Sequence, residues 1–197
     1  MSKIAEFFFD VGSPASYLAW TQLPKLCAKT GATLVYKPML LGGVFQATGN
    51  SSPASVPHKG RYMTKDLGRF AKRYGVTLVM NPHFPINTLT LMRALVGIQL
   101  HQPERFDAVL SAVFNAMWIE AQNLNDPTLA VQVFEKAGFA AAQIMALVGD
   151  AEVKAALKAN TEAAVQRGIF GAPTVFVGDE MFFGQDRLDF VTEALMA

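Results

Sequence analysis

The residues best suited to chemistry lie near the N-terminus, where an apolar run ends at Asp10 and Ser13-Pro14 follows. Serine is a favoured helix N-cap and proline suits the first helical position, so a helix should begin here with the Ser13 hydroxyl at its positive end. Free amides and the helix dipole at such an end stabilise an anion, for example a thiolate or a carboxylate. Ser13 therefore either caps its helix only, or also faces a bound anion.

The same stretch lacks the sulfur that its position would suggest. A strand followed by C-x-x-C at a helix start is the thioredoxin redox signature, and the corresponding window here is Ser13-Pro14-Ala15-Ser16. The single cysteine, Cys27, lies at helical spacing with Leu23 and Leu26, which indicates a core thiol and leaves no internal disulfide. Any thiol chemistry at Ser13 must use a sulfur that comes from another molecule.

The elements that must position Ser13 follow a strand–helix–strand order. The apolar run 4–9 predicts a buried strand, 14–30 a helix that ends at Gly31, and 33–38 a second strand, parallel to the first. Residues 39–56 contain Gly42, Gly43, Gly49, Asn50 and Pro53, and we expect a loop there. Apolar side chains in this loop could line a small-molecule site, or the loop could be an ordinary crossover.

Helical patterns then occupy most of the chain until strand signals return near the C-terminus. Residues 59–167 predict an inserted all-helical domain, and residues 1–58 with 168–197 predict the domain that surrounds it. A strand over 173–177, a turn at Gly178-Asp179, a strand over 180–183 and a helix over 186–196 complete the order. With the insertion removed, βαβ followed by ββα is the thioredoxin layout.

Two further motifs carry chemical potential in that layout. Pro173 stands at the head of a predicted strand, where thioredoxin-like folds place a cis proline facing the first helix, and we expect it to be cis. Asp186, at the start of the last helix, either caps that helix or accepts hydrogen bonds from a ligand ammonium group, while nearby amides hold a carboxylate.

Composition excludes several classes of function. Lys and Arg (17) nearly balance Asp and Glu (16), so nothing favours nucleic acid or an anionic membrane as a partner. No apolar run reaches the roughly 20 residues of a spanning helix, and the N-terminus has no secretory signal pattern. The histidines have no metal-ligand spacing, so we expect no metal site, and we expect a soluble cytoplasmic protein.

Six motifs in the same order give the chain a resemblance to a known family. They are Phe9-Asp10 with Ser13-Pro14 and Tyr17-Leu18, Leu41-Gly42-Gly43, Gly49-Asn50, Val56-Pro57-His58-Lys59-Gly60-Arg61-Tyr62, Phe170-Gly171-Ala172-Pro173-Thr174 and Phe183-Gly184-Gln185-Asp186-Arg187. Together they resemble the 2-hydroxychromene-2-carboxylate isomerases and the kappa-class glutathione transferases. The resemblance implies a DsbA-like thioredoxin fold, the α/β class, with the helical insertion described above.

The family resemblance also implies a glutathione site. Ser13 matches the serine that favours the glutathione thiolate and is the catalytic residue, and Ala172 before Pro173 matches the residue whose backbone pairs with the cysteinyl part. The motif from Phe183 through Gly184 to Gln185 and Asp186 matches the segment that holds the γ-glutamyl end. Asn50 and Lys59 match residues that border the site in the kappa-class pattern.

The resemblance implies a glutathione-dependent isomerase that interconverts 2-hydroxychromene-2-carboxylate and trans-o-hydroxybenzylidenepyruvate, a step in naphthalene-type degradation, and a homodimer. An apolar wall for the aromatic substrate is expected from Val44, Phe45, Thr48 and Phe84. Two alternatives stay open: a kappa-class transferase that conjugates electrophilic aromatic substrates, and a thioredoxin-like module that binds glutathione without turnover.

Overall fold

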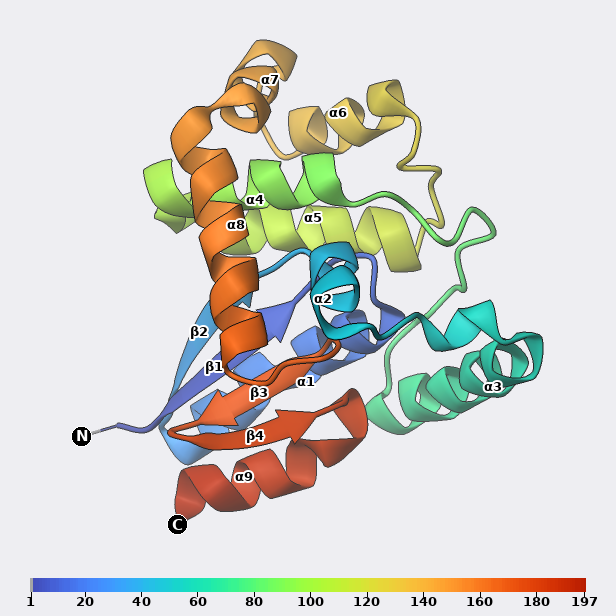
Figure 1. Cartoon of the computed structure of the whole chain (residues 1–197), viewed down its shortest axis with the longest axis vertical. Coiled ribbons are helices and arrows are strands. Elements are labelled where there is room, and N and C mark those ends of the chain that lie inside the picture. The colour runs from blue at the N-terminus through green and yellow to red at the C-terminus, as the bar shows by residue number, and fades with distance from the viewer. Residues whose placement is uncertain (1) are drawn as a thin grey trace.

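The computed structural model describes residues 2–197 and centres on a four-stranded mixed sheet (Figure 1). Its strands are β1 (Ile4–Phe9), β2 (Thr33–Pro38), β3 (Thr174–Val177) and β4 (Glu180–Phe183), in the order β2-β1-β3-β4. β1 and β2 are parallel, whereas β3 is antiparallel to both β1 and β4. The predicted thioredoxin-like layout is therefore confirmed, with the two ends of the chain joined in one sheet.

Helices cover both faces of the sheet because β1 presents apolar side chains to each side. Phe7 and Phe9 belong to the main core with α1 (Pro14–Thr30), whereas Phe8 points into a smaller core. On that second face the sheet packs against α2 (Leu41–Thr48) and α8 (Ala151–Gln166), while α9 (Leu188–Met196) packs on the α1 side (Figure 1). The alternation of side chains along a strand explains the two cores.

The long segment between β2 and β3 forms the predicted series of helices. Besides α2 and α8 these are α3 (Pro57–Tyr74), α4 (Leu89–His101), α5 (Phe106–Trp118), α6 (Pro127–Lys136) and α7 (Ala141–Gly149). The division into two domains, at 58/59 and 167/168, stays a prediction. Within residues 2–197 no single helix is long and apolar enough to cross a membrane. Only α6 and α7 taken together have that length and apolar character, and the two helices are bent by 114° relative to each other.

The predicted loop over residues 39–56 is wrong in its first half, because Leu41–Thr48 forms the helix α2. Glycine disfavours helix formation, yet here it permits close packing: a Cβ atom on Gly43 would lie 3.1 Å from the Thr161 methyl group of α8. The Leu40 N–H also donates to Thr161 Oγ1 at 3.0 Å. Contacts with α8 therefore stabilise a helix that the local sequence disfavours.

Candidate functional site

Ser13 and the Ala172–Pro173 peptide meet at the start of α1. The Ser16 N–H donates to Ser13 Oγ at 3.1 Å, so Ser13 is the predicted N-cap. Its hydroxyl donates to the Ala172 carbonyl oxygen, also at 3.1 Å, and the Ala172–Pro173 bond is cis as expected. Two segments that are 159 positions apart in the sequence are thereby joined at one edge of the sheet.

Two polar groups beside Ser13 have no protein partner. The Gln185 side chain is only 8% exposed and faces the same cavity as Ser13, yet its amide makes no hydrogen bond within residues 2–197. The backbone N–H of Ala172 likewise donates to no group in the described part of the chain. Ala172 is half-buried and the Gln185 amide is open to the cavity, so this pair of unused groups offers hydrogen bonds to a polar ligand.

The turn that carries Gln185 is fixed from both sides. The Tyr74 hydroxyl donates to the Gln185 carbonyl at 2.6 Å, and burial, with Asp189 and Asp186 nearby, raises the pKa of Tyr74 to about 12. The Gly184 N–H donates to the Pro173 carbonyl at 2.9 Å, and Gly184 has a φ of 101°, which glycine adopts readily. A side chain there would also run into the Asp186 carboxylate.

The Ser13 cavity, as we name the space these groups face, has a volume of about 580 Å³. One end is polar and contains Ser13, Gln185 and Asp186. The apolar wall of the cavity is formed mainly by Met63, Leu67, Met80, Phe84 and Ile86. No Lys or Arg side chain of residues 2–197 lines the cavity, and its charged residues are Asp10 and Asp186.

Asp10 is the lining residue whose role the sequence did not reveal. It is 1% exposed, and its carboxylate accepts hydrogen bonds from the Gly12 N–H (2.9 Å), the Leu41 N–H (2.8 Å) and the Thr88 hydroxyl (3.0 Å). Burial raises the pKa of Asp10, and these three donors only partly offset it. Asp10 thus ties together the turn before α1, the start of α2 and the start of α4.

The predicted site residues fall into two groups. The Ser13 cavity brings together Ser13, Ala172, Pro173, Phe183, Gly184, Gln185, Asp186 and Phe84. Five others do not line it: Val44, Phe45, Thr48, Asn50 and Lys59. Val44 lies in the smaller core with no exposed surface, and Asn50 holds the Phe170 carbonyl through its amide at 2.8 Å. Of the predicted apolar wall only Phe84 lines the cavity, and the other apolar lining residues come mainly from α3 and the segment before α4.

Met63 and Leu67 were missed as site residues because their helical spacing on α3 is equally typical of core positions. No signal in the sequence separates the two uses. Met80 and Ile86 lie in the irregular segment before α4, where the Phe84–Pro85 bond is cis. Three adjacent histidine or carboxylate side chains, which a metal ion would need, are not found within residues 2–197.

Comparison with known proteins places this geometry in a family. The DSBA-like thioredoxin domain matches residues 4–196. The 2-hydroxychromene-2-carboxylate isomerase of Pseudomonas putida is 36% identical, over 98% of this chain and 94% of its own. Rat glutathione S-transferase kappa 1 is 30% identical, over 98% and 91%. The chain belongs to this family of DsbA-like thioredoxin-fold enzymes.

Solved structures agree with the family assignment. A 2-hydroxychromene-2-carboxylate isomerase structure superposes with a TM-score of 0.83 at 33% identity, covering 98% of this chain and 94% of that one. A probable DsbA oxidoreductase from Streptomyces coelicolor gives a TM-score of 0.74 at 19% identity, covering 98% and 88%, and shares the fold. Among DsbA-like chains, this one keeps the cis proline but has Ser13 and Ser16 where the C-x-x-C pair would stand.

Proposed function

We propose that this protein is a glutathione-dependent isomerase that interconverts 2-hydroxychromene-2-carboxylate and trans-o-hydroxybenzylidenepyruvate. The observation that carries the proposal is the meeting of the Ser13 hydroxyl, the unpaired Ala172 N–H and the unpaired Gln185 amide at one end of an apolar cavity. Relatives with that name, up to 36% identical over nearly the full chain, support it.

The unpaired groups fit a small peptide-like molecule. The Ala172 N–H would receive a carbonyl of the cysteinyl part, while Gln185 and Asp186 would hold the γ-glutamyl end, helped by the backbone of Phe183 and Gly184. Asn50 and Lys59 would border the site from outside the cavity. When bound, glutathione would supply the thiol nucleophile, because no cysteine lines this cavity within residues 2–197.

Ser13 has the position needed to favour an ionised thiol. Its hydroxyl, which now donates to the Ala172 carbonyl, can turn and donate to a sulfur instead. The first-turn amides of α1 and the helix dipole add partial positive charge at the same point. A free thiol has a pKa of about 8.5, and such surroundings lower it towards neutrality.

The apolar wall would hold the aromatic body of the substrate. Met63, Leu67, Met80 and Phe84 face the polar end of the cavity and offer no hydrogen-bonding side chains. Such a wall binds a ring through apolar contact and keeps water from the reacting atoms. Residues on α2 other than Leu41 and Gly42 have no part in this wall.

One observation favours the kappa-class transferase as a second candidate. A substrate carboxylate buried against the apolar wall would find no Lys or Arg among the lining residues, and an unpaired buried charge is costly. Lys59 is exposed and precedes the lining residue Gly60, so it lies next to the lining in sequence but is not part of it. A neutral aromatic electrophile needs no such partner.

One experiment separates these functions. The protein is incubated with the chromene carboxylate, with and without glutathione, and separately with a chlorinated nitrobenzene and glutathione. Isomerisation that requires glutathione supports the isomerase, and conjugation alone supports the transferase. Glutathione binding by calorimetry without either reaction indicates a binding module. If calorimetry detects no glutathione binding, both enzyme proposals are wrong.

A lysine variant sharpens the choice. In the isomerase, Lys59→Met should raise KM for the carboxylate substrate several-fold, because the charge that meets the carboxylate is lost. Lys72→Met, on an exposed part of the same helix whose neighbours in sequence do not line the cavity, is the matched control and should leave KM unchanged. Equal KM values in the two variants would mean that Lys59 does not contact the substrate.

A cytoplasmic homodimer is part of the same proposal, and it rests on the family resemblance. Light scattering coupled to size-exclusion chromatography measures the mass of the assembly directly. A mass near 21.4 kDa, that of one chain, would show that the protein works as a monomer.

A further inference from the structure

A second cavity lies beside α2, opposite the side that faces Ser13. The α2–α8 cavity, as we name it, is formed by α2, α4 and α8 and has a volume of about 600 Å³. Gly43, Gln46 and Ala47 of α2 line it, whereas Leu41 and Gly42 line the Ser13 cavity. The two spaces therefore use different residues of the same short helix, and the function proposed above leaves the second one unused.

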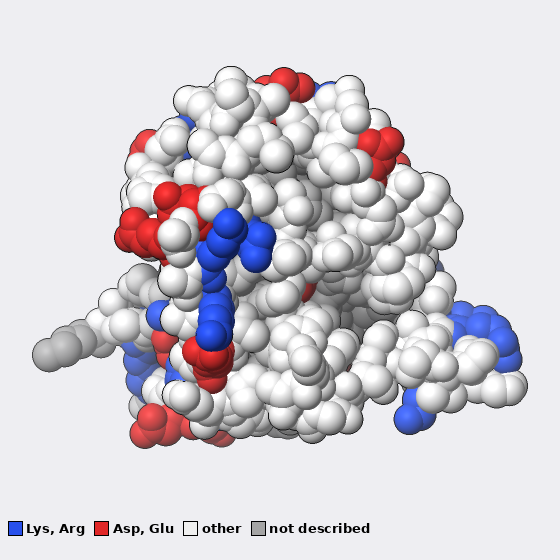
Figure 2. Space-filling view, turned by 45° about the horizontal axis from the view of Figure 1, so that its top comes forward, with Lys and Arg blue, Asp and Glu red and all other residues white. Residues whose placement is uncertain are grey.

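The α2–α8 cavity is basic although the whole chain is nearly neutral. Its charged lining residues are Arg93, Lys154, Lys158 and Glu162, a surplus of two positive charges (three minus one), whereas the full chain carries +1. Glu162 is already paired with Lys158 at 3.7 Å. Figure 2 shows a run of basic side chains on this face, beside a hollowed surface, with acidic side chains at either end. The cavity thus attracts anions.

Arg93 is the residue that most needs an anion. It projects from α4, where its neighbours Met92 and Ala94 are fully buried, and its own side chain is half-buried. Within residues 2–197 its guanidinium group makes neither a hydrogen bond nor an ion pair, although it carries five donors. These unused donors are still open to the cavity, so they are available to an acceptor from outside the chain.

The floor of the cavity is apolar and rigid. Leu40, Leu89, Leu157 and Val165 supply it. Thr161 fixes the junction of α2 and α8, because its Oγ1 accepts from the Leu40 N–H at 3.0 Å and donates to the Leu157 carbonyl at 2.8 Å. Of the lining cations, Lys154 already donates to the Gly149 carbonyl at 2.6 Å and Lys158 pairs with Glu162, which leaves Arg93 without a partner. An apolar floor next to an unpaired guanidinium suits a molecule that has an apolar body and one charged head.

We propose that the α2–α8 cavity binds a small amphiphilic anion, a carboxylate or sulfonate with an aromatic or aliphatic body. The head contacts Arg93 and Lys154, where charge-assisted hydrogen bonds form, and the body lies on Leu89 and Leu157. The volume is in the range of small-molecule sites, roughly 300–1,000 Å³. An inorganic anion would leave the apolar floor uncovered, so it binds more weakly.

Two probes test the proposal on the full chain. The fluorescence of 8-anilinonaphthalene-1-sulfonate is titrated first, and dodecanoate is then added as a competitor, with methyl dodecanoate as the uncharged control. We expect saturable binding that dodecanoate displaces, that the methyl ester displaces far less, and that weakens with added salt. Failure of dodecanoate to displace the probe would overturn the proposal.

Four variants locate the bound probe. Arg93→Met should weaken binding roughly tenfold or more, as expected for a lost charge-assisted hydrogen bond. Ala47→Trp, at an exposed lining position, should abolish binding by filling the cavity. The matched controls are Arg69→Met, on the surface of α3, and Ala54→Trp, which fills the Ser13 cavity instead. Both controls should bind as the unchanged protein does.

Other results are equally decisive. If Ala54→Trp abolishes binding while Ala47→Trp does not, the probe occupies the Ser13 cavity and the proposal is wrong. If the unchanged protein binds no probe and Arg93→Met turns a dimer into a monomer, a second copy of the chain covers this face, and the proposal is wrong. Circular dichroism melting confirms that each variant is folded, and Arg93→Gln replaces Arg93→Met if the latter is not.

Discussion

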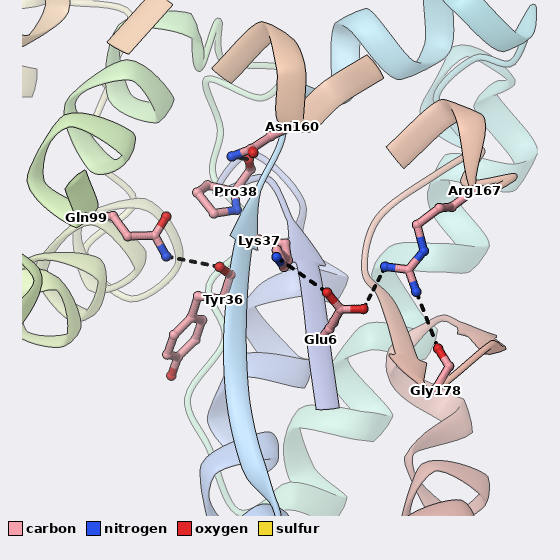
Figure 3. A network of polar contacts seen from close by, with 8 residues as sticks. All are labelled: Glu6, Tyr36, Lys37, Pro38, Gln99, Asn160, Arg167 and Gly178. Atoms are coloured by element: carbon pink, nitrogen blue, oxygen red, sulfur yellow. Dashed lines mark hydrogen bonds and ion pairs between the residues drawn. The ribbon is translucent and has the colours of Figure 1, made fainter. Parts of the chain in front are cut away.

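Two carboxyl groups, Glu6 within β1 and Asp10 just past the end of the strand, show how differently nearby positions can hold an acid. Glu6 lies on the α8 side of the sheet between two cations, with Arg167 at 2.6 Å and Lys37 at 3.4 Å (Figure 3). Asp10, just past the C-terminal end of the strand, has no ion-pair partner within residues 2–197 and is held by three uncharged donors. The first arrangement is typical of a surface ion pair, and the second of a functional site.

The two environments shift the pKa values in opposite directions. Burial alone would raise the pKa of Glu6, but the hydrogen bond and charge of Arg167, with Lys37, hold it below its ordinary value. Burial raises the pKa of Asp10, and its three donors do not fully compensate. A charge kept in a buried place without a counter-ion lowers stability, and proteins retain such groups mainly where they position a site.

The largest expected effect comes from removing the Asp10 carboxylate. Asp10→Ala leaves the Gly12 N–H, the Leu41 N–H and the Thr88 hydroxyl without an acceptor, and each such loss costs about 1–3 kcal/mol where water cannot enter. We expect the free energy of unfolding to fall by roughly 3 kcal/mol or more, as measured by urea denaturation. Glu6→Ala is the matched control, and we expect it to lose about 1 kcal/mol at most. Equal losses would remove the distinction between the two acids.

Removing the cation that pairs with Glu6 should have a smaller effect. Arg167 pairs with Glu6, and its guanidinium carbon lies 3.7 Å from the centre of the Phe176 ring. Arg167→Met should therefore lower the free energy of unfolding by about 1–2 kcal/mol, from both lost contacts. Arg69→Met, which removes an exposed pair with Asp66, should cost less than about 0.5 kcal/mol. Calorimetry should find that Arg167→Met leaves glutathione binding unchanged. Weaker binding would show that the Glu6 ion pair influences the Ser13 cavity.

Ser13→Ala tests whether the site end of β1 is more than a helix cap. Loss of the cap should lower the free energy of unfolding by about 1 kcal/mol. In the presence of glutathione, the pKa of the bound thiol should also rise, since one donor to the thiolate is lost. The ultraviolet absorbance of the thiolate follows its ionisation. Thermal melting of the same variant separates the two effects. An unchanged pKa of the bound thiol would show that Ser13 acts only as a helix cap.

The pH dependence of stability should have opposite signs for the two acids. The folded-state pKa of Glu6 lies below its ordinary 4.5, so its contribution is present above that value and is lost as the pH falls through the folded pKa. The folded-state pKa of Asp10 lies above its ordinary 3.8, so stability decreases as the pH rises from that value to the folded pKa. Urea denaturation of Glu6→Gln and Asp10→Asn, from about pH 3 to about pH 8, should remove one slope each. Slopes of the same sign would contradict the assignment.

The smallest effect is expected at Ser16, one turn from Ser13 in α1. The Ser16 hydroxyl is fully buried and has no hydrogen-bond partner within residues 2–197. Ser16→Ala removes an unsatisfied polar group from the core, so the free energy of unfolding should rise by up to about 1 kcal/mol. The melting temperature gives the measurement. A loss of stability would show that the hydroxyl has a partner, such as an ordered water.

The fold was predictable wherever the signals are local. The bounds of β1, β2 and α1 follow from an apolar run, a cap and a glycine stop, and all three coincide with the predicted limits. α2 was missed because the residue that requires a glycine at position 43 is Thr161, which lies on α8 and far along the chain. A propensity that tertiary packing overrides leaves no trace in a single sequence.

The site was predictable only in part for the same reason. Ser13, Pro173 and Gln185 stand in motifs that the thioredoxin layout brings to one edge, and the structure does bring them there. The burial of Asp10 depends on donors 31 and 78 positions away, at Leu41 and Thr88, so nothing near it in the sequence distinguishes it from a turn residue. Lys59 and Asn50 were placed by resemblance, and the structure sets both outside the cavity.

Amide exchange at the start of α2 should report whether Asp10 is protonated. The backbone N–H groups of Leu40 and Leu41, like all first amides of a helix, have no acceptor within the helix. Thr161 Oγ1 takes the first and the Asp10 carboxylate the second, at 3.0 and 2.8 Å. Protonation of Asp10 should weaken the hydrogen bond that its carboxylate accepts from the Leu41 N–H. Hydrogen–deuterium exchange at Leu41 should therefore accelerate. The Leu40 N–H donates to a threonine hydroxyl, which does not titrate. Its exchange rate is therefore the internal control in the same molecule.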